Sequence, residues 1–181
     1  MRKVFWTITF FWWAMDFYLL VLKRKGGHRI SERKSKFIMM MLIFAGVLLA
    51  IVPESFRAVW RTRPFGLWQV AGTFILASGV LLRFLSVLHL GKHFAPDIGF
   101  RHDRELVTTG LYRWSRHPSY TGEIIAFIGL GIIFQHFPAS LFIVLFPAAA
   151  FIYRAIVEEK LLIEEFGQEY LEYRKKTRMF V

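Results

Sequence analysis

Residues 120–153 read YTGEIIAFIGLGIIFQHFPASLFIVLFPAAAFIY, and Glu123 is the one charged side chain among them. Two apolar runs, 120–137 and 138–153, follow each other here without a charged linker. A backbone inside a bilayer has to satisfy its own hydrogen bonds, and an α-helix does so within one segment. The stretch therefore predicts a tight hairpin of two membrane helices, with Pro147 placed to kink the second one.

Three further apolar runs precede the hairpin, at residues 4–22, 37–52 and 68–90. We do not expect the first to be a cleaved signal peptide, because bulky side chains occupy positions 20–22, where small ones are needed. The chain of 181 residues is 55% hydrophobic and 18% aromatic, which is more apolar surface than a soluble domain of this size can bury. We therefore expect an all-α integral membrane protein with about five transmembrane helices, three of them within residues 1–90 and the hairpin within residues 91–181.

The distribution of charge predicts the orientation of these helices. The net charge is +11, and the polar segments 23–36, 91–119 and 154–181 together carry 18 of the 24 basic residues, whereas the segments facing the other way carry five. Basic loops stay in the cytoplasm, so all three segments are expected there. We interpret the positive charge as an orientation signal, with contacts to membrane lipids as the alternative for 23–36, and expect no nucleic-acid partner.

The most unusual polar stretch comes immediately before the hairpin and reads GLYRWSRHPSYTG over residues 110–122. Pro118 suits the first turn of a helix, where its missing amide proton costs nothing. The unpaired amides of such a helix start attract carboxylates and phosphates, and Arg113, Arg116 and His117 lie close to it in the sequence. The competing interpretation is an interfacial belt of arginine and aromatic side chains.

A second polar cluster follows the last apolar run. Arg154 and Glu158 are four residues apart and share one face of a helix, at the point where the apolar run ends. Gly167 can end that helix. The cluster is either an ordinary solvated helix or a charged pair at the membrane margin that holds a ligand.

Taken together, the two clusters resemble the isoprenylcysteine carboxyl methyltransferase family, within the integral-membrane methyltransferases that include phospholipid methyltransferases. The family pattern is present as LVTTGLY at 106–112, RHPSYTG at 116–122, and Arg154 with Glu158 and Glu159, followed by FGQEYLEY at 166–173. The resemblance covers residues 94–173 and implies S-adenosylmethionine as cofactor, held in a cytosolic pocket. It implies cofactor contacts at Asp97, Arg104, Glu105, Leu106, Val107, Tyr112, His117, Pro118, Ser119, Tyr120 and Glu158, and assigns Arg154 to the methyl acceptor.

The acceptor expected from this resemblance is the carboxylate of a prenylated cysteine. Methyl transfer from a sulfonium to a carboxylate needs in-line approach and little acid–base help. A phospholipid amine, a small thiol or a lipidic hydroxyl is the alternative acceptor, and an amine or hydroxyl would require a base such as Glu123, Glu159 or His117. An NADPH-dependent membrane reductase and a non-enzymatic membrane protein remain the other function classes. We expect the inner membrane in a prokaryote or the endoplasmic reticulum in a eukaryote, and no obligate protein partner.

Several other features are expected to be structural. The chain has no cysteine, and His89 and His93, although four residues apart, have no clear third partner, so we predict no metal site. Asp16 and Arg83 lie in separate apolar runs and are expected to pair inside the bundle. Gly129 and Gly131 are expected to mark close packing between helices.

Overall fold

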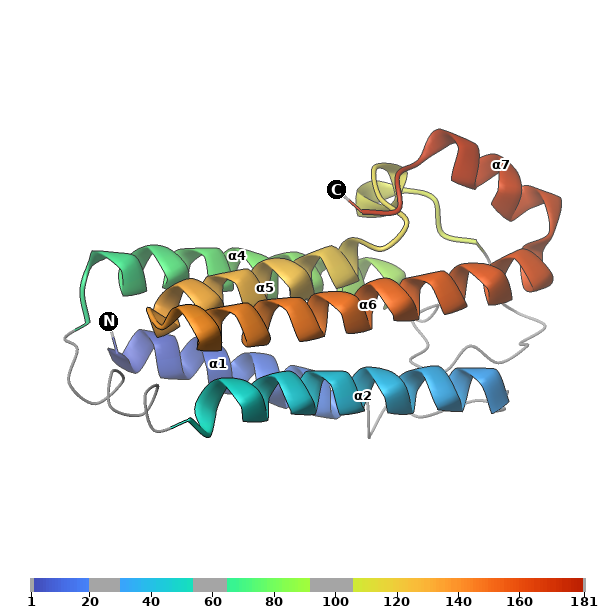
Figure 1. Ribbon diagram of the computed structural model, residues 1–181. Helices are drawn as coiled ribbons and strands as arrows, with labels where there is room; N and C mark the ends of the chain where they lie inside the picture. Colours follow the sequence, from blue (N-terminus) through green and yellow to red (C-terminus); the bar gives the residue numbers. More distant parts are fainter. Residues whose placement is uncertain (1, 20–29, 54–64, 92–105, 181) are drawn as a thin grey trace.

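The computed structural model describes residues 2–19, 30–53, 65–91 and 106–180, and nearly all of them are helical. The elements are α1 (Arg2–Phe17), α2 (Ile30–Ile51), α4 (Leu67–Leu90), the 3-10 turn η3 (Gly110–Arg113), α5 (Pro118–Phe134), α6 (Phe137–Phe166) and α7 (Gln168–Lys176). Figure 1 shows α4, α5 and α6 side by side, with α1 and α2 along one face of this layer. Helix α7 and the C-terminal residues turn back over the end of the bundle where η3 lies.

The expected all-α membrane architecture is confirmed. Among the described residues, three helices are long and apolar enough to cross a membrane, over Lys34–Ile51, Leu67–Leu90 and Phe137–Phe166, and α5 is a shorter apolar helix of 17 residues. Helices α5 and α6 form the predicted hairpin. Its connection is short because Gln135 adopts a left-handed conformation that ends α5, and the His136 side chain accepts a hydrogen bond from the amide of Ala139 to begin α6.

The second arm of the hairpin is longer than the apolar pattern indicated. That pattern ends at residue 153, whereas α6 continues as one helix to Phe166 and contains Pro147 in its interior. Its polar continuation stays helical because one face remains buried, including Arg154, Ala155, Glu159 and Leu161. Helix α2 likewise begins at Ile30, before its apolar run starts at residue 37. For α2 and α6 the apolar run therefore located the helix but underestimated its length.

Glycines bring α4 and α5 into backbone contact. A Cβ atom added at Gly79 would lie 2.4 Å from the amide nitrogen of Ala126, and one added at Gly129 would lie 2.4 Å from the amide nitrogen of Leu76. Gly131 faces the other neighbour, because its Cβ would lie 2.7 Å from a methyl group of Val144 on α6. Small residues at these positions let membrane helices approach closely. The expectation that Gly129 and Gly131 serve helix packing is confirmed.

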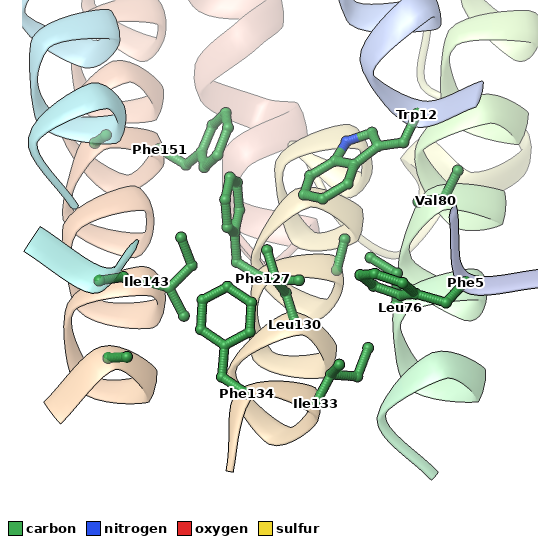
Figure 2. Close-up of a cluster of buried hydrophobic side chains, with 14 of the residues drawn as sticks. Phe5, Trp12, Leu76, Val80, Phe127, Leu130, Ile133, Phe134, Ile143 and Phe151 are labelled. Atoms are coloured by element: carbon green, nitrogen blue, oxygen red, sulfur yellow. The ribbon is translucent and has the colours of Figure 1, made fainter. Parts of the chain in front are cut away.

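An aromatic and aliphatic core joins α1 to this pair of helices (Figure 2). Phe5 and Trp12 of α1 are buried against the layer, and the Trp12 ring meets Phe127 of α5 edge-on at 4.9 Å between centroids. The opposite side of α1 leaves Trp6, Phe10 and Trp13 exposed. Such a surface suits contact with lipid chains.

We predict that Gly79→Ala separates α4 from α5 and lowers the melting temperature in detergent. The added methyl group meets fixed backbone atoms of α5, and overpacking of this kind costs about 1–3 kcal/mol. Gly66→Ala at the start of α4 is the matched control, because its Cβ would meet only the end of the Gln69 side chain at 3.5 Å. Equal melting temperatures for the two variants would contradict the predicted contact.

Candidate functional site

The site is built on the first turn of α5. His117 caps this helix, and its carbonyl accepts the first intrahelical bond from the amide of Thr121 at 3.0 Å. Pro118 has no amide proton. The amides of Ser119 and Tyr120, like those in the first turn of any helix, have no partners within the helix. Pro118 occupies the first helical turn, as the sequence predicted, and both it and Ser119 are buried. The positive end of the helix dipole coincides with this turn.

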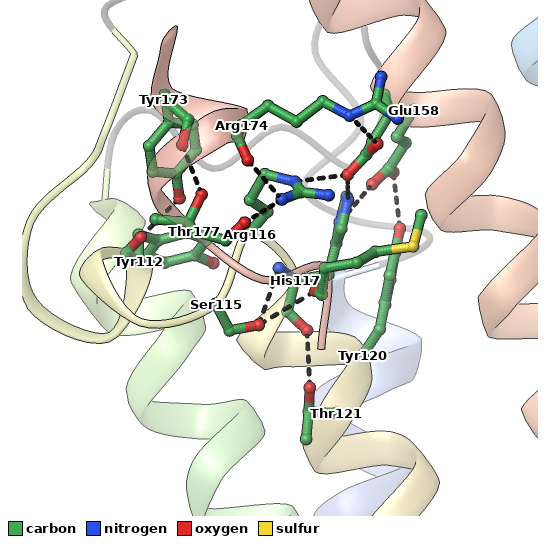
Figure 3. Close-up of polar contacts among 12 residues, drawn as sticks. Tyr112, Ser115, Arg116, His117, Tyr120, Thr121, Glu158, Tyr173, Arg174 and Thr177 are labelled. Carbon is green, nitrogen blue, oxygen red and sulfur yellow. Dashed lines mark hydrogen bonds and ion pairs between the residues drawn. The ribbon is translucent and has the colours of Figure 1, made fainter. Parts of the chain in front are cut away.

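The hairpin returns the acidic end of α6 to the start of α5 (Figure 3). The Tyr120 hydroxyl donates to Glu158 Oε1 at 2.6 Å, and the His117 ring lies parallel to the Tyr120 ring with 5.6 Å between centroids. His117 Nδ1 is 3.7 Å from Glu158 Oε2, and His117 Nε2 is 3.6 Å from Glu159 Oε1. Two sequence blocks separated by the whole hairpin thus form one cluster.

Arg116 joins this cluster to α7 and to the C-terminal tail. Its Nε donates to Glu159 Oε1 at 2.6 Å, and its terminal nitrogen donates to the carbonyl oxygens of Arg174 and Thr177. The second oxygen of Glu159 lies 3.5 Å from Arg174 Nε. Glu159 therefore lies between two arginines, Arg116 before α5 and Arg174 on α7.

The C-terminal tail, residues 177–180, is a part of the site that the sequence analysis did not identify. The amides of Arg116 and His117 donate to the carbonyls of Arg178 and Met179 at 2.9 and 3.2 Å. The Phe180 ring lies 6.2 Å from the His117 ring. Backbone pairing between residues so far apart leaves no periodic pattern, so no sequence signal marked this segment.

Arg154 is enclosed between α6 and α2. Its Nε lies 3.2 Å from Glu158 Oε1, as the four-residue spacing predicted, and its terminal nitrogen donates to Ser35 Oγ at 2.5 Å. The residue is only 2% exposed. Ser35 of α2 therefore covers the head of this side chain.

The tyrosines of η3 and α7 link these two elements to each other and to α4. The Tyr173 hydroxyl donates to the carbonyl of Tyr112 at 2.6 Å, and the Tyr112 hydroxyl faces the carbonyl of Ser86 at 3.5 Å. Burial raises the pKa of Tyr173 to about 12 and also raises the pKa values of Tyr112 and Tyr170. These phenols therefore remain protonated hydrogen-bond donors at neutral pH.

Among the described residues, two buried polar atoms of this region make no hydrogen bond: the Tyr170 hydroxyl, and His117 Nε2, which faces Glu159 Oε1 at 3.6 Å. Tyr170 is 1% exposed and its ring lies 5.9 Å from that of Tyr173. A buried polar group without a partner costs about 1–3 kcal/mol, so such groups commonly mark a place where a ligand binds. Sequence reasoning noted Tyr170 but gave it no role.

The remaining predicted residues divide into two groups. Leu106 and Val107 are half-buried just before η3, while Asp97, Arg104, Glu105 and His93 lie outside the described residues. Within the described part of the chain, no three or more His, Cys, Asp or Glu side chains gather in a way that could hold a metal ion. The predicted pair of Asp16 and Arg83 is present, with 2.6 Å between Oδ1 and Nε.

Comparison with known proteins finds a matching family and several relatives. The sequence model of a family described as phospholipid methyltransferase matches residues 67–169. Protein-S-isoprenylcysteine O-methyltransferase of Schizosaccharomyces pombe is 32% identical over 115 residues, covering 62% of this chain and 49% of that protein. The enzyme of the same name from Saccharomyces cerevisiae is 38% identical over 114 residues, covering 61% and 47%. The chain thus spans about half the length of these relatives.

A third relative and a solved structure extend over more of the chain. Protein-S-isoprenylcysteine O-methyltransferase B of Arabidopsis thaliana is 24% identical over 168 residues, covering 88% of this chain and 82% of that protein. The structure of the eukaryotic intramembrane Ras methyltransferase ICMT superposes with a TM-score of 0.55 at 24% identity, covering 82% of this chain and 52% of that one. The likeness to that structure is a likeness of fold.

We predict that Arg116→Lys loosens the C-terminal tail. Lysine keeps the charge beside Glu159 but lacks the second donor arm that reaches the carbonyls of Arg174 and Thr177. Loss of these two charge-assisted bonds should speed hydrogen exchange of the amides of Arg116 and His117 at least about tenfold. Arg113→Lys is the control, because that exposed side chain lies over the Trp114 ring and leaves the tail unchanged. Unchanged exchange in the Arg116 variant would refute this role.

Proposed function

The chain belongs to the phospholipid methyltransferase family, and we propose that it transfers the methyl group of S-adenosylmethionine to a lipid-linked acceptor at the cytoplasmic face of a membrane. The acceptor we propose is the carboxylate of a prenylated cysteine, the substrate class in the names of its relatives. The observation that carries this function is the convergence of His117, Tyr120 and Glu158 on the first turn of α5, near the buried Tyr170 hydroxyl, which makes no hydrogen bond with the described residues.

The chemistry of these groups fits the proposed cofactor. S-adenosylmethionine carries a carboxylate, an ammonium group, an adenine ring and a sulfonium. The amides of Ser119 and Tyr120 at the helix start suit the carboxylate. The anionic side chain of Glu158 suits the ammonium group, and the rings of His117 and Tyr120 offer flat faces to adenine or to a cation. Asp97, residues 104–107 and Tyr112 complete the proposed contacts.

Arg154 supports a carboxylate as acceptor. When bound, S-adenosylmethionine supplies a methyl group on a sulfonium sulfur, and a carboxylate oxygen can accept it without a base. The planar guanidinium of Arg154 can hold such a carboxylate by two parallel hydrogen bonds when the ligand displaces its contacts with Ser35 and Glu158. It lies beside Glu158, so an acceptor held there is next to the proposed cofactor site. We propose that the site faces the cytoplasm, where 18 of the basic residues are expected.

The decisive experiment for this function is an assay of the purified protein with methyl-labelled S-adenosylmethionine. The acceptors are a farnesylated cysteine, phosphatidylethanolamine, a small thiol and a phenolic lipid. We expect label on the farnesylated cysteine in a bond that alkali hydrolyses, as an ester requires. Label on phosphatidylethanolamine alone would show that the acceptor is an amine and not a carboxylate. No transfer to any acceptor, with no binding of S-adenosylhomocysteine, would refute the proposed function.

We predict that His117→Ala and Glu158→Gln each weaken S-adenosylhomocysteine binding about tenfold or more. Each change removes a polar or charge-assisted contact of about 1.4 kcal/mol or more. Glu172→Gln is the control, because that carboxylate is exposed on α7 and its loss leaves the site intact. Isothermal titration of the purified proteins gives the affinities, and unchanged affinity in both site variants would contradict the cofactor assignment.

A substitution at Arg154 tests binding of the acceptor separately from binding of the cofactor. Arg154→Lys keeps the charge but loses the planar fork, so kcat/KM for the farnesylated cysteine should fall roughly ten- to a hundredfold. Affinity for S-adenosylhomocysteine should change much less, because Glu158 and the start of α5 remain. Ser35→Ala is the matched control, because it removes one hydrogen-bond partner of Arg154 and leaves the guanidinium itself beside Glu158. A parallel collapse of activity and cofactor affinity would remove Arg154 from the acceptor role.

A further inference from the structure

A cluster of three charged side chains from three helices lies inside the bundle. Arg83 of α4 sits between Asp16 of α1 and Glu123 of α5, with its Nε 2.6 Å from Asp16 Oδ1 and in contact with Glu123 Oε1. The side chains of Arg83 and Glu123 are 9% and 1% exposed. Trp12 Nε1 lies 3.3 and 3.1 Å from the two oxygens of Glu123 and donates to this carboxylate. The sequence predicted the pair of Asp16 and Arg83 but not the addition of Glu123.

Stability alone does not account for these charges. Removing charged groups from water is costly, and replacing a buried ion pair by apolar side chains of similar volume is often neutral or stabilising. Ionisable residues inside a membrane bundle therefore usually serve a function, and the direction in which they point indicates which one.

The guanidinium of Arg83 points toward the candidate site. While its Nε faces the two carboxylates, its terminal nitrogen donates to Ser119 Oγ at 2.9 Å. Ser119 lies on the first turn of α5, between His117 and Tyr120, and Glu123 follows it one turn later on the same face. The rigid, planar guanidinium of Arg83 thus binds the carboxylates of Asp16 and Glu123 on one side and the Ser119 hydroxyl on the other.

The glycine contact between α4 and α5 fixes the distance between the backbone of Arg83 and the first turns of α5. A Cβ added at Gly122 would lie 2.7 Å from the amide nitrogen of Arg83, so the backbones touch where Arg83 leaves α4. The side chain therefore has little freedom to follow Ser119 if that residue moves. Asp16 and Glu123 restrict it further from the remaining sides.

We propose that Arg83 is a positioning residue of the cofactor site. It holds the Ser119 hydroxyl and with it the first turn of α5, whose amides and flanking side chains bind the cofactor; Asp16 and Glu123 keep its guanidinium in place. This inference rests on the proposed function, and it makes helix α1 a support of the site, although α1 supplies none of the proposed cofactor contacts.

The test is a double-mutant cycle on S-adenosylhomocysteine affinity, which needs no acceptor. Arg83→Lys keeps the charge beside the carboxylates but cannot also reach Ser119, and Ser119→Ala removes the hydroxyl. We expect each variant to bind about tenfold more weakly, and the double variant to be no weaker than either single one, because all three lack the same contact. In turnover, KM for S-adenosylmethionine should rise about tenfold with kcat changed less than twofold. Effects that multiply, or a KM that does not change, would overturn the proposal.

A second variant separates positioning from folding. The triple change Asp16→Leu, Arg83→Met, Glu123→Leu leaves no unpaired charge, so it should melt near the wild-type temperature and yet bind as weakly as Ser119→Ala. Thr73→Val is the matched control on α4, because its buried hydroxyl donates only within its own helix, to the carbonyl of Gln69. Wild-type affinity in the triple variant would refute the role of Arg83 and leave the proposed function standing. Absence of binding by the wild type would refute both.

Discussion

The backbone contact between α4 and α5 is the constraint on which the site depends. Glycines at 72, 79, 122 and 129 allow two apolar helices to touch along two turns of each, where any larger residue would collide with main-chain atoms. The contact sets the depth of α5 in the bundle, and hence the position of the helix start that carries His117 and Tyr120. It also brings the base of Arg83 against Gly122, within reach of Ser119.

Charge determines how the other end of the chain closes on that helix start. Helix α6 runs past its apolar part and presents Glu158 and Glu159 to His117 and Arg116. Each carboxylate has several partners, so the α6 end, α7 and the C-terminal tail are held by one connected network. Networks of this kind define a geometry more sharply than isolated surface pairs, which contribute little.

The sequence predicted features that depend on local spacing. The hairpin, the start of α5 at Pro118, the pairing of Arg154 with Glu158 and the close packing at Gly129 all follow from apolar runs, proline chemistry or helical periodicity. It could not predict which side chains from other helices complete each group. Ser35 beside Arg154, Glu123 beside Arg83 and the tail beside His117 are neighbours through packing and backbone pairing, which leave no periodic trace.

One oxygen atom, Glu158 Oε1, accepts from the Tyr120 hydroxyl and also faces Arg154 Nε. In the proposed reaction these two donors contact different ligands. Tyr120 lies at the cofactor site, and Arg154 binds the acceptor. An acceptor that draws the guanidinium away leaves the oxygen more negative and more available to a cationic cofactor. If the proposed site roles hold, the two binding steps are coupled through this atom, and the coupling is reciprocal, because each ligand then strengthens the binding of the other by the same factor. Such an arrangement favours the assembly of a ternary complex over the accumulation of either binary one.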